Sequence, residues 1–418
     1  MVVMLPIVRH PSFVEEFLPR LNGVFTKPQL KQFARYLTGL VVCENKTVTG
    51  INSSFMGRND QSALNHWLTD SGWSEENLDK ARKAMILDSL QARRVRRGIL
   101  VVDDTLNHKT GKHMEGVNIH YDHAEGRYVL GHQLVTSDLV ISDLSIPLDF
   151  ELYTRDEGQP DFKTKQELFR ILVERAAEEG LPFTCVVADT WYFNRRNMRF
   201  VEELGRDWVA GCKSNRLILM PGGWTPVSAY IQTVPRSKFK EVKVQTGKGE
   251  RRFWAYAKNV TMKEGWRVRI VISYEEPGLK GEPKFLASNR LDWDVKTILE
   301  TYLKRWKIDS SYRDAKQDLG LEDYEVRKLR GIRRHWLMVF LAHDLLQFSS
   351  RRGGPIGWMK AGLATVGSRC RYAVMEVLSS FIELVVNLAR KVKNPDEILK
   401  LTTSDIKSLK TLYQMEIT

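Results

Sequence analysis

Residues 93–105 read RRVRRGILVVDDT, and the character of the chain changes at this stretch. Four arginines come first, an apolar run at residues 99–102 follows, and Asp103 and Asp104 come directly after it. A short apolar run bounded by polar residues is typical of a buried strand. We therefore predict a strand here whose carboxyl end carries acidic side chains.

The segments after this strand predict a mixed α/β layer. Strand-like segments occupy residues 127–141 and 144–153, and an amphipathic helix follows at about 163–179. Residues 183–190, FTCVVADT, repeat the pattern of an apolar strand followed by Asp189. The next segments, RRNMRFVEEL and DWVAGCK, are typical of a helix and a strand. Three strands followed by helix, strand, helix and strand is the order expected of a ribonuclease-H-like core.

The rest of the chain differs from this core. Residues 47–69 contain two helical segments around a glycine, a pattern compatible with either a helix-turn-helix or an ordinary helical pair. We predict a helical DNA-binding domain at residues 1–97, an α/β ribonuclease-H-like catalytic core (a mixed sheet with flanking helices) at 98–213 and 291–350, a β-strand insertion at 214–290, and a helical C-terminal region at 351–418.

Bulk properties favour a polyanionic partner. The chain has 418 residues and a net charge of +13, and a surplus of this size favours approach to nucleic acid or to an anionic surface. Its uninterrupted apolar runs are far shorter than the roughly 20 residues needed to span a bilayer. The four cysteines are scattered without CxxC spacing, which favours free thiols in a reducing cytoplasm. We expect no membrane association.

Two acidic residues stand at predicted strand ends. Asp104 and Asp189 each follow an apolar run, and the carboxyl ends of strands in open α/β sheets face the edge where ligands bind. Two close carboxylates raise each other's pKa, and a divalent cation removes that cost. All-oxygen ligands suit Mg²⁺ or Mn²⁺. A third carboxylate on a helix crossing the sheet, supplied by Asp309, completes a site for two metal ions.

The segment that carries Asp309 predicts one continuous helix with a selective polar face. In YLKRWKIDSSYRDAK, the residues Tyr302, Arg305, Asp309 and Lys316 are three, four and seven positions apart. These steps return to the same face of an α-helix. A solvated surface stripe is the alternative interpretation of this spacing.

The four-residue register resembles the YREK motif of prokaryotic insertion-sequence transposases with a DDE catalytic triad. All four positions keep the spacing of the motif, although Asp309 stands where the motif has Glu. Asp is shorter by one methylene, and catalytic geometry tolerates little displacement. The difference implies either a helix that lies closer to the metals or a weakened activity.

Three other segments extend the resemblance. VVDDT is similar to the first-Asp segment of the family, in which the acid directly before Thr is catalytic, and this implies Asp104. VVADT is similar to the second-Asp segment and implies Asp189. WVAGCKSNR is similar to the following strand, whose basic residue touches the DNA end, and this implies Lys213.

The resemblance implies a DNA transposase with a cut-and-paste route. Asp104, Asp189 and Asp309 would hold two Mg²⁺ ions, with Mn²⁺ as a substitute, while Tyr302, Arg305, Trp306, Lys316 and Lys213 would contact DNA. The implied partners are double-stranded DNA, comprising the inverted-repeat ends and the target, and a second copy of the chain in a DNA-bound homodimer. The implied location is the cytoplasm of a prokaryote, at the nucleoid. Two alternatives stay open: a catalytically weakened or domesticated transposase that binds DNA, and a ribonuclease-H-fold nuclease.

Overall fold

The structure is a computed structural model. It describes residues 6–57, 60–155, 162–246, 249–263, 265–348 and 362–391. The chain forms two compact units. One comprises residues 1–93, 108–117 and 312–418, and the other comprises residues 94–107 and 118–311. Each unit is described by itself.

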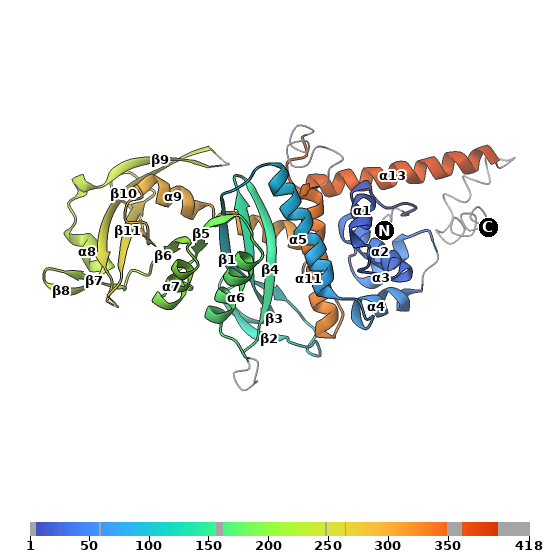
Figure 1. The fold of residues 1–418 in the computed structure, drawn as a ribbon, viewed down its shortest axis with the longest axis horizontal. Coiled ribbons are helices and arrows are strands. Elements are labelled where there is room, and N and C mark those ends of the chain that lie inside the picture. The colour runs from blue at the N-terminus through green and yellow to red at the C-terminus, as the bar shows by residue number, and fades with distance from the viewer. Residues whose placement is uncertain are drawn as a thin grey trace. The chain divides into compact units, whose positions relative to one another are not determined.

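The unit that contains residues 118–311 is built on one mixed sheet of ten strands within the described residues (Figure 1). The strand order is β2-β3-β1-β5-β6-β12-β11-β10-β9, and β4 pairs with β3 off this path. The strands are β1 (Gly98–His108), β2 (Asn118–Asp122), β3 (Arg127–Ile141), β4 (Leu144–Tyr153), β5 (Phe183–Ala188), β6 (Asp207–Gly211), β9 (Lys240–Thr246), β10 (Gly249–Thr261), β11 (Arg267–Tyr274) and β12 (Lys284–Ser288). A separate hairpin joins β7 (Leu217–Met220) to β8 (Gly223–Pro226).

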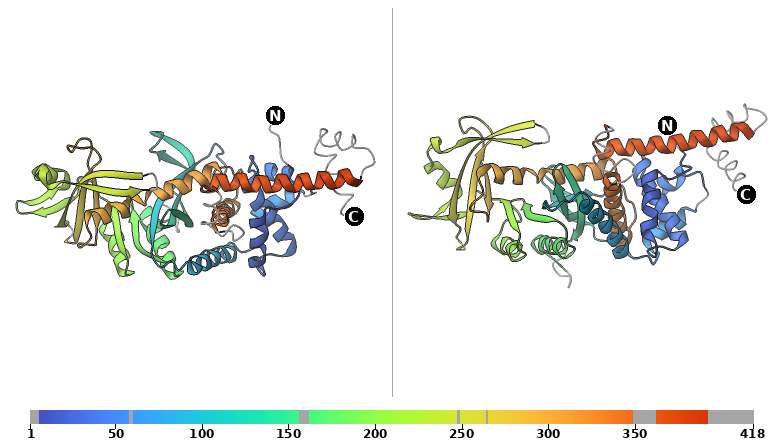
Figure 2. Two further views of the ribbon diagram at one scale, coloured as in Figure 1. Left: turned by 90° about the horizontal axis from the view of Figure 1, so that it is seen from above. Right: turned by 45° about the horizontal axis from the view of Figure 1, so that its top comes forward.

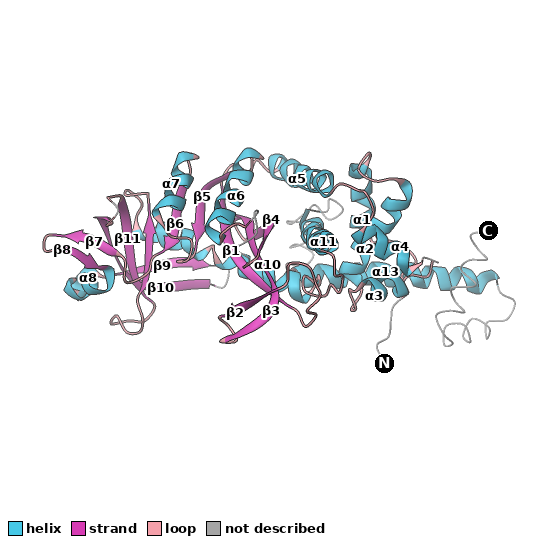
Figure 3. Cartoon of the chain, turned by 90° about the horizontal axis from the view of Figure 1, so that it is seen from below, coloured by secondary structure: helices cyan, strands magenta, loops and turns pink. Residues whose placement is uncertain are grey.

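The centre of the sheet is parallel and buried. β5 pairs in parallel with both β1 and β6, and its residues are almost all apolar, as expected for a strand covered on both faces. The helices α6 (Lys165–Glu178) and α7 (Arg195–Glu203) lie on one side of the sheet, and α10 (Trp306–Gln317) lies on the other (Figure 3). The helix α9 (Val295–Leu303), which precedes α10, packs against β6, β9 and β10. The candidate site described below lies at the carboxyl end of β5.

Local sequence explains how the two helices on the first side begin. Thr164 and Glu167 form a capping box at the start of α6, and Asn194 accepts a hydrogen bond from the amide of Asn197 at the start of α7. Both arrangements satisfy backbone amides that the first helical turn leaves without partners. A short α8 (Val227–Thr233) and a 3₁₀ turn (Arg236–Lys238) lead from the hairpin to β9.

The prediction of one continuous helix through residues 302–316 is wrong. α9 ends at Leu303 and α10 begins at Trp306. Between them the amides of residues 304, 305, 307 and 308 bond carbonyls three positions back, the tighter pattern of a 3₁₀ turn. No glycine or proline marks the break. Helix propensity alone therefore does not account for the break, and Arg305, whose contacts are described below, lies within it.

The other unit is helical in its described residues. Its helices are α1 (Ser12–Phe17), α2 (Lys27–Val42), α3 (Val48–Ser54), α4 (Gln61–Thr69), α5 (Glu75–Ala92), α11 (Leu329–Phe348) and α13 (Val366–Lys391), and a 3₁₀ turn spans Leu18–Leu21. α11 is buried over almost its whole length and packs against α2, α4 and α5. It therefore forms the centre of this unit.

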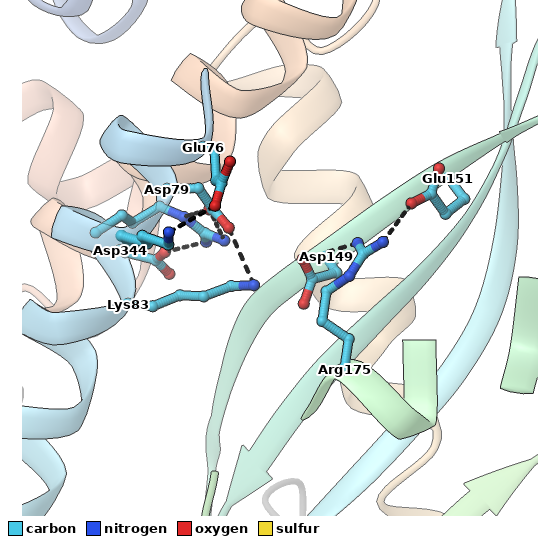
Figure 4. Close-up of polar contacts among 9 residues, drawn as sticks. Glu76, Asp79, Lys83, Asp149, Glu151, Arg175 and Asp344 are labelled. Atoms are coloured by element: carbon cyan, nitrogen blue, oxygen red, sulfur yellow. Dashed lines mark hydrogen bonds and ion pairs between the residues drawn. The ribbon is translucent and has the colours of Figure 1, made fainter. Parts of the chain in front are cut away.

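A buried ion pair joins α5 to α11. The Arg82 guanidinium lies 2.8 Å from Asp344 and 2.7 Å from Asp79, and both Arg82 and Asp344 are almost fully buried (Figure 4). In the sheet-containing unit, Arg175 of α6 pairs in a similar way with Asp149 and Glu151 of β4 (Figure 4). A buried charge is costly unless it is paired, so these contacts fix which helix faces which neighbour.

The mixed sheet with flanking helices predicted from the sequence is confirmed. The segments predicted at 127–141 and 144–153 coincide with β3 and β4, and all four cysteines are buried and free. The four domain boundaries stay predictions. Arg58 of the predicted helical pair and much of 351–418 lie outside the described residues.

The last described helix, α13, contacts α2 and α11 and is visible along its length in Figure 2. Two of its apolar residues face outward in the structure: Ile382 is 52% exposed and Val386 is 44% exposed, whereas Leu388 is buried. Among the described residues, Val366–Arg390 is the one helix long and apolar enough to cross a membrane by length and composition, a weak criterion that helices of soluble proteins also meet.

Candidate active site

Asp103 and Asp104 lie inside the strand β1, whereas the sequence predicts that they stand at its end. β1 continues past Asp104 to His108, whereas its parallel neighbour β5 ends at Ala188. β1 continues because β3, its neighbour on the other side, still runs beside it there. Gly131 of β3 lies so close to the Asn107 carbonyl that an added Cβ would be 2.5 Å from that oxygen. The carboxylates therefore stand beside the end of β5, on a strand that continues.

Asp103 and Asp104 take different partners because successive side chains of a strand point to opposite faces. In the parallel pairing of β1 with β5, Val102 lies opposite Ala188. The next residues along the two strands, Asp103 and Asp189, therefore lie side by side. The Asp103 carboxylate pairs with the guanidinium of Arg305, on the α10 side of the sheet. Asp103 therefore lies on the face that α10 covers.

Asp104 faces the other side of the sheet. Its Oδ2 accepts hydrogen bonds from Gln133 Nε2 at 2.6 Å and from Lys165 Nζ at 3.0 Å. Its Oδ1 accepts a longer bond, 3.3 Å, from the hydroxyl of Tyr192. Lys165 is the first residue of α6, so this carboxylate is tied to the helices opposite α10.

Asp189 follows β5 directly and is fixed by the turn that comes after it. Its Oδ1 accepts hydrogen bonds from the amides of Trp191 at 2.8 Å and Tyr192 at 3.3 Å. Tyr192 is fully buried and stacks on Phe169 of α6, with ring centres 5.2 Å apart. The turn therefore holds one oxygen of Asp189 and leaves its other oxygen for a ligand.

Arg305 connects the acids of the sheet to the acid of α10. One nitrogen of its guanidinium pairs with Asp103, and another lies 3.9 Å from Asp309 in the first turn of α10. Arg305 stands in the turn between α9 and α10. The break in the helix is therefore the point at which the two helices contact the carboxylates of the sheet.

The three acids on this face resist ionisation. Burial raises the pKa of Asp103 to about 7, with the Arg305 guanidinium opposing the shift and the carboxylates of Asp189 and Asp104 adding to it. Burial also raises the pKa of Asp189 and that of Asp309. Carboxylic acids with raised pKa values that share a site are characteristic of catalytic and metal-binding centres.

Tyr302 is the one aromatic residue of α9, and its hydroxyl lies close to Gly211 of the sheet. A Cβ added at Gly211 of β6 would lie 3.0 Å from the Tyr302 hydroxyl and 2.8 Å from the Thr190 side chain. Burial raises the pKa of the Tyr302 phenol. A small residue is therefore needed at 211 to seat the phenol beside the Asp189 turn.

The other residues predicted to contact DNA differ in their exposure and in their neighbours. Trp306 is 55% exposed, and the Arg305 guanidinium lies 4.6 Å from the centre of its ring. Lys213, just after β6, is exposed. Lys316 lies in the last turn of α10, seven residues after Asp309, and its amino group is 2.6 Å from a carboxylate oxygen of Glu322.

The structure thus brings Asp189, Tyr302, Arg305 and Asp309 to one face of the sheet, together with Asp103. Asp104, the residue assigned from the resemblance, faces the other side. The signal for Asp103 is present in the sequence, since aligning the ends of the two apolar runs at Val102 and Ala188 sets Asp103 opposite Asp189. That alignment requires knowing that the two strands are parallel neighbours.

Comparisons with known proteins identify the family to which the chain belongs. A family model described as DDE superfamily endonuclease matches residues 16–236, more than half of the chain. The chain therefore belongs to the DDE superfamily endonucleases, and membership of this family implies dependence on a divalent metal. The matched span includes Asp103, Asp104 and Asp189 and stops before Asp309.

A similar protein of known class indicates which kind of DDE enzyme this chain is. A probable transposase for insertion sequence element IS701 from Microchaete diplosiphon is 26% identical over 325 residues, which cover 75% of this chain and 76% of the relative. The prediction of an insertion-sequence DDE transposase, and with it of a DNA transposase, is confirmed. A solved structure, the piggyBac transposase synaptic complex with hairpin DNA, covers 91% of this chain and 76% of its own, with 12% identity and a TM-score of 0.48, too distant to carry an argument about the site.

Proposed function

We propose that this DDE transposase binds the inverted-repeat ends of its element and cuts and joins DNA by a metal-dependent cut-and-paste route. One observation carries the proposal. Acids from β1, the end of β5 and α10 lie on one face of a mixed sheet, and the guanidinium of Arg305 contacts two of them. The raised pKa values of these acids support a site that binds a cation.

We propose Asp103 as the first acid of the triad, with Asp189 and Asp309 as the second and third. The register beside Asp189 and the ion pair with Arg305 support Asp103. Asp104 is the alternative, and it is supported by its position directly before Thr105. Under our assignment Asp104 is a positioning residue that holds Lys165 at the edge of the site.

The donor set fits Mg²⁺, with Mn²⁺ as a substitute. All donors are carboxylate oxygens, which hard divalent cations prefer. A bound cation would offset both the burial that raises the pKa of Asp103 and the smaller contribution of the neighbouring carboxylates. Two bound ions would activate the attacking oxygen and stabilise the leaving oxygen at phosphorus. Within the chain, Asp103, Asp189 and Asp309 would hold these ions, and Arg305 would balance the negative charge that remains.

We propose that Tyr302, Arg305, Trp306, Lys316 and Lys213 contact DNA near the cut. The net charge of +13 supports a polyanionic partner. We further propose that residues 1–97 recognise the repeat, that 214–290 act as a β insertion beside the core, and that 351–418 are a helical C-terminal region. The complex on DNA is a homodimer in this proposal, in the cytoplasm at the nucleoid.

A catalytically weakened or domesticated transposase is the second candidate, and Asp309 is the observation that favours it. Its carboxylate is nearly half exposed and one methylene shorter than the Glu of the motif. A ribonuclease-H-fold nuclease without strand transfer would need the acids but not the register of Tyr302, Arg305 and Lys316.

The test is cleavage of a labelled duplex that carries the terminal sequence flanking the coding region, with Mg²⁺, Mn²⁺ or EDTA. We expect cleavage at the element boundary with either metal and none with EDTA. Joining of the cut end to a second DNA separates a transposase from a nuclease. End binding without cleavage in both metals would favour the weakened transposase.

A further inference from the structure

Trp191 is an exposed tryptophan that the triad and the predicted DNA contacts leave without a role. It is 55% exposed and lies two residues after Asp189. Single exposed apolar side chains are common on protein surfaces, so a role for Trp191 must be argued from the groups that surround its ring. Its position is therefore the starting point for an inference about the DNA end.

The backbone of Trp191 is held rigidly although its ring is exposed. Its amide donates a hydrogen bond to Asp189 at 2.8 Å, and its carbonyl accepts one from Gln166 Nε2 at 2.9 Å. The next residue, Tyr192, is buried, and its carbonyl accepts bonds from the side chains of Asn194 and Asn197. The backbone position from which the ring projects is thus set by one tight turn directly after Asp189.

Two lysines from different elements flank this ring. Lys165 Nζ lies 5.9 Å from the ring centre and Lys213 Nζ lies 5.7 Å from it. Lys165 is also paired with Asp104, so its position is fixed by the sheet. An exposed ring between two ammonium groups is a surface that suits a nucleobase with its phosphates.

A basic cavity continues from Lys213. It has a volume of about 350 Å³, and its lining includes Lys213, Asn215, Arg216, Lys263 and Trp266. Three of these described residues are positively charged, which suits a phosphate-bearing segment. Lys213 therefore borders both the ring of Trp191 and this cavity.

We propose that Trp191 is the platform on which one unpaired base at the cut end of the DNA stacks, while Lys213 and its cavity take the adjoining phosphates. Extruding a base from a duplex costs stacking and pairing energy, and an aromatic surface beside the site recovers part of it. Trp191 is thus a positioning residue that holds the scissile phosphate at the carboxylates. This inference rests on the proposed function.

The test compares wild type, Trp191→Ala and Trp191→Phe on a set of labelled duplexes with Mg²⁺. One duplex carries the fully paired terminal sequence, and the others carry a single abasic site at successive positions next to the cut. On the paired duplex we expect Trp191→Ala to lower kcat/KM by about ten- to hundred-fold, the range for loss of one stacked base. Trp191→Phe should stay within about three-fold, because it keeps an aromatic face. Trp224→Ala, which removes another exposed tryptophan on β8, is the matched control and should cut like wild type.

The abasic duplexes distinguish stacking from a structural role. At one position, the ratio of wild-type to Trp191→Ala activity should fall toward one, because the base that Trp191 would hold is missing. A ratio that stays the same at every position, or Trp191→Ala activity equal to wild type on the paired duplex, would overturn the proposal. If wild type cuts none of the duplexes while Trp191 variants melt normally, the proposed function itself fails and this inference falls with it.

Discussion

Arg305 shows how one residue can carry both an expected and an unexpected role. Its place in the register predicts a phosphate contact, and the structure shows it paired with Asp103 and close to Asp309. A guanidinium can bind a carboxylate through one edge and present further donors to a phosphate. Before DNA and metal arrive, this charge offsets the repulsion among the buried acids.

The assignment of the first acid gives a prediction at the residue scale. Asp103→Ala should reduce Mg²⁺-dependent cleavage by about a thousand-fold or more, since metal ions supply several kcal/mol of transition-state stabilisation. Asp104→Ala should leave measurable cleavage, because its bonds go to Gln133, Lys165 and Tyr192. Gel assays of both variants, with end binding measured in parallel, decide the matter. Loss of activity in Asp104→Ala together with active Asp103→Ala would return the role to Asp104.

The shorter third acid gives a second prediction. We expect the native Asp309 to be competent, because Arg305 already holds the α9–α10 turn against the sheet acids. Asp309→Glu should then leave cleavage about equal or reduce it, since the extra methylene displaces a positioned carboxylate. Cleavage rates in Mg²⁺ and in the more tolerant Mn²⁺ measure this. A ten-fold gain in Mg²⁺ on restoring Glu, worth about 1.4 kcal/mol, would instead favour the weakened transposase.

At the scale of elements, the contact between β6 and α9 decides how the site closes. The end of β6 approaches both the Asp189 turn and the phenol of Tyr302, and a Cβ added at Gly211 would lie within 3.0 Å of Thr190 and of the Tyr302 hydroxyl. A packed contact of this kind tolerates little added volume. The small side chain at 211 thus links the strand to the helix that leads into Arg305.

Gly211→Ala tests this contact. The new Cβ would meet the Thr190 side chain at 2.8 Å and the Thr190 amide and Tyr302 hydroxyl at 3.0 Å. We expect about 1–3 kcal/mol of destabilisation from overpacking and a fall in cleavage larger than the fall in end binding, because the turn that holds Asp189 must shift. Gly72→Ala, where a Cβ meets nothing within 4 Å, is the control. Wild-type cleavage by Gly211→Ala would show that the turn adapts freely.

At the scale of the whole molecule, buried histidines tie stability to pH. His335 is fully buried between the Tyr36 hydroxyl and the Gly320 carbonyl, and burial lowers its pKa to about 3. Burial likewise lowers the pKa of His343 to about 3 and that of His10 to about 4. The folded chain therefore keeps these rings neutral at pH values where the unfolded chain protonates them.

The sign of the pH dependence follows from this difference. Between pH 6.5 and about 3 the unfolded state binds the extra proton at His335, so the free energy of unfolding falls as pH falls, by about 1.4 kcal/mol per pH unit per histidine. Urea unfolding at pH 7, 6 and 5 should show this loss. His335→Gln should be less stable at pH 7 but lose less between pH 7 and 5. An unchanged slope in the variant would mean that His335 is protonated in the fold.

Much of the fold could be predicted because its signals are local. β3 and β4 coincide with their predicted segments. β12 was not anticipated, since it becomes a strand only through pairing with β6 and β11. The break between α9 and α10 could not be predicted either, because no glycine or proline marks it in the sequence.

The sequence by itself determined the chemistry of this protein: the acids after two apolar runs, the spaced residues from Tyr302 to Lys316, and a basic surplus that favours DNA. These features depend on residue type and short-range spacing, which the chain carries directly. Only the tertiary structure decided which face each acid occupies. Asp103 and Asp104 are adjacent and identical in type, so local sequence cannot separate them. Strand alternation and the parallel pairing of β1 with β5 separate them in space, because register assigns neighbouring side chains to opposite faces of the sheet.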